Sequence, residues 1–475
     1  MQWADRSAWI AFCVDDEANQ SPHEGARSLN DKEFFMKSRR DFLARAMGLS
    51  AGLAAGPRLL AAEKSTASKD THARSAASGR NNVLVETPDV PQLPWRVVDG
   101  AKEFHLVAEP VKRRLIPGRE MQVWGYNGSC PGPTIQVNQG DRVRVVFENK
   151  LPESTSIHWH GLEIPVAMDG MPYISQPPVA PGGKFVYEFT LNQAGTFFYH
   201  SHGAMQEMMG MIGMFVIHPA KPWAPQVDHD FGIVMQEWAI LPNNNVPNTA
   251  NMEFNWLTFN GKAAPDTTPI VVRHGSRVRV RLVNMGMDHH PIHLHGNTFA
   301  VTGSEGGRQP EATWGPANTV LVGVAQARDI EFVASNPGDW MLHCHLPHHM
   351  MNSMSDLMGD RMMTTMRLDG SSAMSQMQTY ANTVGVPHRH HAPIAEDAEK
   401  VPGFPQDAFM EMGMDEAVYR PEHYGLPTNW SASFMGMMTL VRIVPDELYE
   451  RIQSLKSRPA NENAAPPAEA SHDRS

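Results

Sequence analysis

Cysteine is scarce in this chain. The 475 residues contain only three, Cys13, Cys130 and Cys344, which excludes a disulfide-dense scaffold. Charged residues make up only 19%, and no apolar run reaches the roughly 18–20 residues that a membrane helix needs. The net charge of -11 argues against nucleic acid as a partner, because a phosphate backbone attracts a basic surface. These absences, with 41% hydrophobic residues, predict a soluble globular protein of two or three domains.

Methionine and histidine are abundant instead, at 31 and 23 residues. Imidazole and thioether groups both bind metals, and thioethers favour Cu(I). Cys344 stands between two histidines and is a candidate ligand. Cys130 is expected to be a small buried apolar residue, as lone thiols usually are, and Cys13 to leave with an N-terminal leader.

The N-terminal region carries an export signal. Residues 38–43 read Ser-Arg-Arg-Asp-Phe-Leu, a twin-arginine pattern, and a weakly apolar stretch follows to about Ala62. We therefore expect a signal region over residues 1–62, twin-arginine export and a periplasmic location. Met36 is an alternative translation start, which leaves residues 1–35 outside the natural protein.

The sequence contains an internal repeat. Gly-Asp-Arg-Val-Arg-Val at 140–145 matches Gly-Ser-Arg-Val-Arg-Val at 275–280. The same alignment matches His158 with His293 and His160 with His295. At a slightly larger offset, the segment 200–202 (His-Ser-His) matches 343–345 (His-Cys-His). The repeat predicts two homologous β-sandwich domains.

Short alternating strands with Pro/Gly turns between about 90 and 385 predict an all-β fold. The expected organisation is a linker over 63–90, a first domain over 91–222, a second over 223–385 and a His-, Met- and Pro-rich C-terminal extension over 386–475. Within that extension, residues 441–455 predict a strand that runs into a short helix.

Each His-x-His motif can aim two imidazoles at one point, because residues i and i+2 of a strand share a face. Four such pairs in a repeat predict metal binding. In His343-Cys344-His345 the thiolate faces the opposite side, so one strand joins two metal sites. Cys344, His349 and Met354 form a Cys-x4-His-x4-Met segment, and His290 lies upstream. Two histidines, a cysteine and a weak axial methionine are typical of blue-copper sites.

With these motifs the chain resembles the multicopper oxidases over residues 95–385. The resemblance implies copper at four sites: one type 1, one type 2 and a type 3 pair. It implies a type 1 site formed by His290, Cys344, His349 and Met354. It implies a type 2 site formed by His158 and His293, and a type 3 pair held by His160, His200, His202, His295, His343 and His345. His289 and His348 are expected to be neighbours of these ligands.

The implied activity is one-electron oxidation of a phenol or a metal ion such as Cu(I), coupled to four-electron reduction of O2 to water. The implied fold is two cupredoxin-like Greek-key β-sandwich domains with a Met-rich C-terminal extension. Asp169, before Gly170, resembles the acidic residue of proton relay in the family; as an Asp-Gly pair it is also a turn signal.

The first domain lacks the type 1 ligands. Thr155, Ser201 and Gln206 stand in the places of His290, Cys344 and His349, and Met211 matches Met354. The interval from His158 to His343 holds no third sandwich, so the chain resembles the two-domain, small laccase-type enzymes. In that family such domains meet head to tail between chains, which implies a homotrimer with inter-chain clusters.

Several alternatives stay open. The methionines that follow 200–202 and 343–345 are consistent with core packing or with transient Cu(I) binding. The His-rich cluster 388–391 is either a solvated loop or a set of metal ligands. A copper nitrite reductase needs no type 3 pair, so six type 3 histidines argue against it. A copper-sequestering or electron-transfer cupredoxin is the non-enzymatic alternative.

Overall fold

The structure, a computed structural model, describes residues 82–203, 205–240, 244–352 and 414–458. The expected signal region 1–62, most of the linker 63–90, Met354 and the cluster 388–391 lie outside these residues. None of the described helices is long and apolar enough to cross a bilayer.

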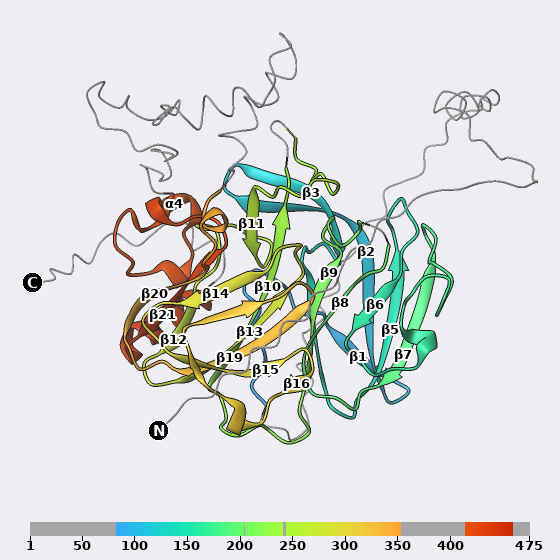
Figure 1. The fold of residues 1–475 in the computed structure, drawn as a ribbon, viewed down its shortest axis with the longest axis horizontal. Helices are drawn as coiled ribbons and strands as arrows, with labels where there is room; N and C mark the ends of the chain where they lie inside the picture. The colour runs from blue at the N-terminus through green and yellow to red at the C-terminus, as the bar shows by residue number, and fades with distance from the viewer. Residues whose placement is uncertain (1–81, 204, 241–243, 353–413, 459–475) are drawn as a thin grey trace, which may run out of the picture. The chain divides into compact units, whose positions relative to one another are not determined.

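The first domain consists of two β-sheets, drawn from blue to green in Figure 1. Its strands are β1 (Trp95–Val98), β2 (Ala101–Ile116), β3 (Arg119–Tyr126), β4 (Gly132–Asn138), β5 (Arg142–Asn149), β6 (Ile157–His160), β7 (Lys184–Thr190), β8 (Gly195–Ser201) and β9 (Ile212–His218). One sheet has the order β1-β2-β5-β7 with β3 beside β2, and the other has the order β4-β9-β8-β6. Val143, Val145 and Phe147 on alternate positions of β5 fill the core between them.

The second domain repeats this arrangement. Its strands are β10 (His229–Trp238), β11 (Trp256–Phe259), β12 (Ile270–Arg273), β13 (Arg277–Asn284), β14 (His290–Leu294), β15 (Phe299–Ser304), β16 (Gly307–Arg308), β17 (Pro316–Ala317), β18 (Thr319–Val322), β19 (Gln326–Val333), β20 (Gly338–Cys344) and β21 (Met438–Val444). One sheet has the order β11-β10-β13-β19-β15-β16 with β17 beside β15, and the other has the order β12-β21-β20-β14-β18. The expectation of an all-β fold with two sandwich domains is confirmed.

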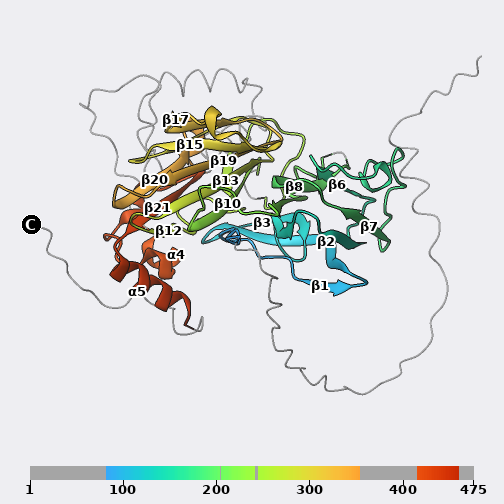
Figure 2. The same ribbon diagram turned by 90° about the horizontal axis from the view of Figure 1, so that it is seen from below.

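The expected domain boundary at residue 385 is wrong. Strand β21 pairs with β12 on one side and β20 on the other, and Figure 2 shows it in red beside these strands. Its residues Val441 and Ile443 are buried in the core of the second domain, so this segment completes the sandwich. The predicted strand and helix over 441–455 are confirmed as β21 and α5 (Asp446–Lys456); the other described helix, α4, spans Asp415–Val418.

The end of the expected linker also belongs to the folded structure. The backbone N–H of Glu86 donates to Asp230 O over 2.8 Å, and Gly232 N–H donates to Glu86 O over 2.9 Å. Val85 is buried between residues of both domains. The linker prediction fails here because an apolar side chain fixes the segment against β10.

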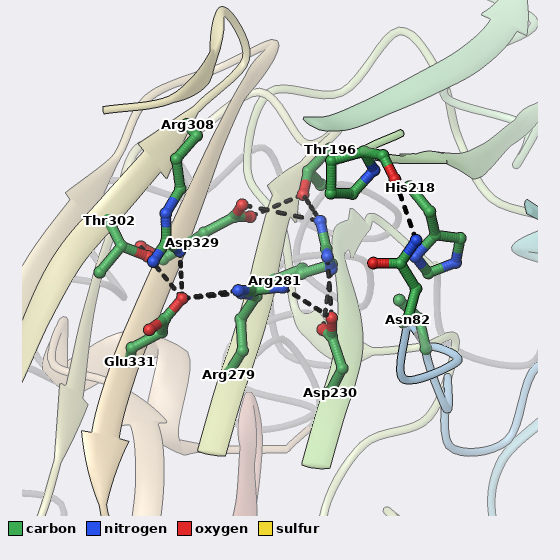
Figure 3. Close-up of polar contacts among 12 residues, drawn as sticks. Asn82, Thr196, His218, Asp230, Arg279, Arg281, Thr302, Arg308, Asp329 and Glu331 are labelled. Carbon is green, nitrogen blue, oxygen red and sulfur yellow. Dashed lines mark hydrogen bonds and ion pairs between the residues drawn. The ribbon is translucent and has the colours of Figure 1, made fainter. Parts of the chain in front are cut away.

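A buried ion network joins the two domains (Figure 3). Arg281 of β13 donates to both carboxylate oxygens of Asp230 at 2.8 Å and to Thr196 Oγ1 of β8 at 2.7 Å. Thr196 in turn donates to Asp329 Oδ1 over 2.6 Å. Arg281 is 1% exposed, so the network fixes β8 of the first domain against the second.

Candidate metal centre

Four histidines of the first domain, His158, His160, His200 and His202, lie together on β6 and at the end of β8. In β6, Ile157 and Trp159 point into the core while His158 and His160 face away from it. Backbone pairing sets His158 opposite His200, and the nearest nitrogens of His160 and His200 lie 3.3 Å apart. One ligand atom of each of these three residues lies within 4.8 Å of the others. The ring of His202 lies 5.5 Å from that of His158, so the four imidazoles form one group.

Four histidines of the second domain form a matching group on β14 and β20. His293 pairs with His343 across these strands, and Nε2 of His295 lies 3.0 Å from Nε2 of His343. The rings of His293 and His345 are 5.5 Å apart. Each domain therefore presents a group of four imidazoles with similar ring separations.

Cys344 lies on the opposite face of β20 from these histidines. It is fully buried with His290, and the nearest nitrogens of His290 and His349 are only 3.1 Å apart. Cys344 Sγ lies 3.6 Å from His290 Nδ1 and 3.4 Å from His349 Nδ1. One thiol sulfur and two Nδ1 atoms converge in a buried position, a donor set that fits type 1 copper.

The neighbouring histidines His289 and His348 take no part in this group. Both are exposed, and His289 Nδ1 accepts the backbone N–H of Val324 over 3.1 Å. The choice of His290 and His349 from the sequence spacing agrees with this geometry, while Met354 lies outside the described residues.

Burial favours the neutral form of several of these imidazoles. It lowers the pKa of His160, His343 and His349 to about 4, and neighbouring histidines add to the effect. Neutral imidazole is the form that binds metals. Burial also raises the pKa of the Cys344 thiol to about 12, so copper has to displace its proton on binding.

Protein oxygens hold the other nitrogen of several imidazoles. The Nδ1 atoms of His158, His293 and His343 lie 2.8, 2.7 and 2.9 Å from the backbone oxygens of Asp169, Asn318 and Cys344. These contacts orient the rings and leave Nε2 as the nitrogen that can bind a metal. In the Cys344 group the Nδ1 atoms of His290 and His349 instead face the thiol sulfur.

Asp169 lies beside His158. Its Oδ1 is 3.4 Å from His158 Nδ1, and its side chain is 38% exposed. The turn is tight, because a Cβ at Gly170 would lie 1.7 Å from Ile157 O, and Gly170 has φ +84°.

Three further carboxylates were not expected from the sequence. Glu207 Oε1 lies 2.9 Å from His200 Nδ1, and Asp288 Oδ2 lies 3.6 Å from His349 Nε2. Glu237 is buried, with Oε1 2.6 Å from His290 Nε2. Glu237 also accepts the backbone N–H of Met287 over 2.8 Å. Such carboxylates orient and tune metal-bound imidazoles.

The place of the Cys344 group in the first domain is filled by hydrogen-bonded polar side chains. Thr155 Oγ1 lies 2.9 Å from Ser201 Oγ, and Ser201 donates to Gln206 Oε1. A hydroxyl pair with an amide offers neither thiolate nor imidazole.

This chain is similar to known proteins in both sequence and fold. Two family models described as multicopper oxidase match residues 109–222 and 240–359. The solved blue copper oxidase from Nitrosomonas europaea is 31% identical, and the match covers 53% of this chain and 81% of that one with a TM-score of 0.50. The chain belongs to the multicopper oxidases.

Curated relatives match shorter parts of this multicopper oxidase. Copper resistance protein A of Pseudomonas syringae pv. tomato is 34% identical over 151 residues, which are 32% of this chain and 25% of the relative. Laccase-1 of Fomitopsis schrenkii is 33% identical over 234 residues, 44% of this chain and 43% of the relative. The chain thus spans less than half the length of both proteins.

Proposed function

We propose that this chain oxidises a reducing substrate one electron at a time at a type 1 copper and reduces O2 to water at a trinuclear copper cluster. The observation that carries the proposal is β20, where Cys344 faces one buried group and His343 and His345 face another. Copper, when bound, supplies one-electron redox chemistry at the first group and O2 reduction at the second. Adjacent residues of one strand therefore connect electron entry with oxygen reduction.

The proposed copper ligands divide between the two faces of β20. His290, Cys344 and His349 hold the type 1 copper. His158 and His293 hold the type 2 copper. The type 3 pair is held by His160, His200, His202, His295, His343 and His345.

Asp169 is proposed to supply protons to oxygen reduction. Its carboxylate contacts both solvent and the ring of His158, so it can receive a proton from water and pass it toward the histidine group. It also orients His158 through its backbone oxygen.

The two histidine groups are proposed to meet between neighbouring chains. Within the described residues, no hydrogen bond, ring contact or ion pair joins a histidine of one group to a histidine of the other. His202 and His345 are exposed, so each group is open on its domain. A head-to-tail homotrimer would close each half with the other half of the next chain.

The electron donor is proposed to be a phenol or a metal ion such as Cu(I), Fe(II) or Mn(II). Asp288 is 47% exposed beside His349, so a carboxylate marks the outer edge of the type 1 site and attracts cations. We propose that the twin-arginine pattern at residues 38–43 directs this activity to the periplasm.

Oxygen uptake tests the proposal. We expect the copper-loaded protein to consume O2 with at least one of a phenol, Cu(I), Mn(II) and Fe(II). Cys344→Ser should abolish both uptake and the intense blue absorption while copper stays at the cluster. Cys130→Ser is the matched control, since Cys130 is the other described cysteine, buried in an apolar cluster of both domains.

Two outcomes would overturn the proposal. Nitrite reduction without O2 uptake would identify a nitrite reductase, and blue absorption with no turnover of any donor would identify an electron carrier. Blue absorption that survives in Cys344→Ser would refute the type 1 assignment.

A further inference from the structure

The first domain contains a metal-free version of the type 1 loop. There β8 ends at Ser201, and Met211 leads into β9. The backbone N–H of Ser201 donates to Met211 O over 3.0 Å, and the N–H of Met211 donates to Gln206 O over 3.2 Å. These two bonds define where the methionine stands relative to the residues that replace the type 1 ligands.

The second domain has the same two bonds with Met437. The backbone N–H of Cys344 donates to Met437 O over 3.0 Å, and the N–H of Met437 donates to His349 O over 2.8 Å. Cys344 stands in the place of Ser201, and His349 stands in the place of Gln206. Met437 is therefore the counterpart of Met211, and the match of Met211 to Met354 is wrong.

Strand register puts Met437 directly opposite Cys344. His343 pairs with Met438 across β20 and β21, so the next pair along this antiparallel ladder is Cys344 with Met437. Opposite residues of such a pair project to the same face, with Cβ atoms about 5 Å apart. Both side chains are fully buried in one core cluster, on the face where His290 also lies.

Gly436 allows this close approach. A Cβ there would lie 2.3 Å from His349 O, and the residue has φ +72°. Gly210 precedes Met211 with a positive φ of 107°. The backbone that presents the methionine is thus alike in the two domains.

We infer that Met437, not Met354, provides the weak axial thioether of the type 1 copper, an inference that rests on the proposed function. His290, Cys344 and His349 supply the other three donors. Residues 350–436 are then an insertion between two type 1 ligands, and Cys-x4-His-x4-Met in the sequence is a coincidental spacing within methionine-rich sequence.

The test compares Met437→Gln with Met354→Gln in the copper-loaded full chain. An amide oxygen is a harder donor than a thioether and favours Cu(II). Met437→Gln should therefore lower the type 1 reduction potential and change the copper hyperfine splitting in electron paramagnetic resonance, and Met437→Leu should raise the potential. Met354→Gln should change neither property.

Met211→Gln is the matched control, because Met211 is equally buried in a domain without type 1 ligands. It should leave the type 1 spectrum unchanged. Met437→Leu nearly conserves volume, so it keeps the test valid where Met437→Gln does not fold. A type 1 potential and spectrum unaltered by both Met437 substitutions would overturn the inference. Absence of blue absorption in the unsubstituted protein would defeat the proposed function instead.

Discussion

At the scale of single residues, the charge of Glu237 is expected to set the potential of the type 1 site. This buried carboxylate lies 2.6 Å from His290 Nε2, and Gly286 leaves it room, since a Cβ there would lie 2.5 Å from Glu237 Oε1. A negative charge behind a ligand stabilises the more positive metal state. Glu237→Gln should raise the type 1 reduction potential by on the order of 60 mV, a tenfold change in a one-electron equilibrium.

Redox titration of the blue absorption measures this shift. Glu207→Gln is the control, because Glu207 contacts His200 of the first-domain group and should leave the type 1 potential unaltered. An unchanged or lower potential in Glu237→Gln would contradict the role given to this carboxylate.

The candidate ligands could be predicted from the sequence because the two-residue period of a strand brings them together locally. His343, Cys344 and His345 need no tertiary information to divide between two faces. Glu237 and Asp288 could not be found in this way. Glu237 reaches His290 from β10, and Asp288 carries no motif of its own, so only the folded arrangement reveals them.

At the scale of strands, β5 and β13 show what near-identical sequence leaves undetermined. Both read Arg-Val-Arg-Val. Arg144 of β5 is partly exposed and pairs with Glu188, whereas its counterpart Arg279 of β13 is buried and pairs with Asp230 and Glu331. Arg281 stands where β5 has Val146, and it is buried at the contact with Thr196 of the first domain. Which copy of the repeat becomes buried depends on how the two domains pack against each other. The local sequence pattern does not determine that packing.

Arg281 is the arginine of β13 that donates a hydrogen bond to Thr196 of the first domain. Arg281→Met should destabilise the protein by about 3–5 kcal/mol, because Asp329 then loses its buried cation and Asp230 loses one of its two described arginine partners. Chemical denaturation of the copper-free protein measures the loss. Arg142→Met removes an exposed pair and should cost less than about 1 kcal/mol. Equal losses in the two variants would show that the buried network contributes no more than a surface pair.

The sequence predicts β21 as a strand but places it in a C-terminal extension, whereas in the structure it belongs to a sheet of the second domain. Its apolar residues are evident in the sequence, yet its partners β12 and β20 are separated from it by long stretches of chain. Pairing over such distances follows from the closed sandwich, so the sequence spacing indicates Met354, and only the folded arrangement shows that Met437 lies opposite Cys344.

At the scale of the whole molecule, we propose that each chain carries two half-clusters and that oxygen is reduced where halves of different chains meet. Each half holds four imidazoles in matching geometry, and the two halves make no described contact with each other. A junction between chains at these two groups accounts for the exposure of His202 and His345 in the single chain.

Mixed oligomers test this claim most directly. One chain would carry His200→Gln in its first-domain group and the other His343→Gln in its second-domain group, with different tags for co-expression and purification of mixed species. Each variant alone should consume no O2. In a head-to-tail trimer that contains both chains, one of the three junctions joins two intact halves, so the purified mixed trimers should recover about a third of the unsubstituted activity. No recovery in mixed oligomers that contain both chains, or an active monomer of the unsubstituted protein, would contradict the account.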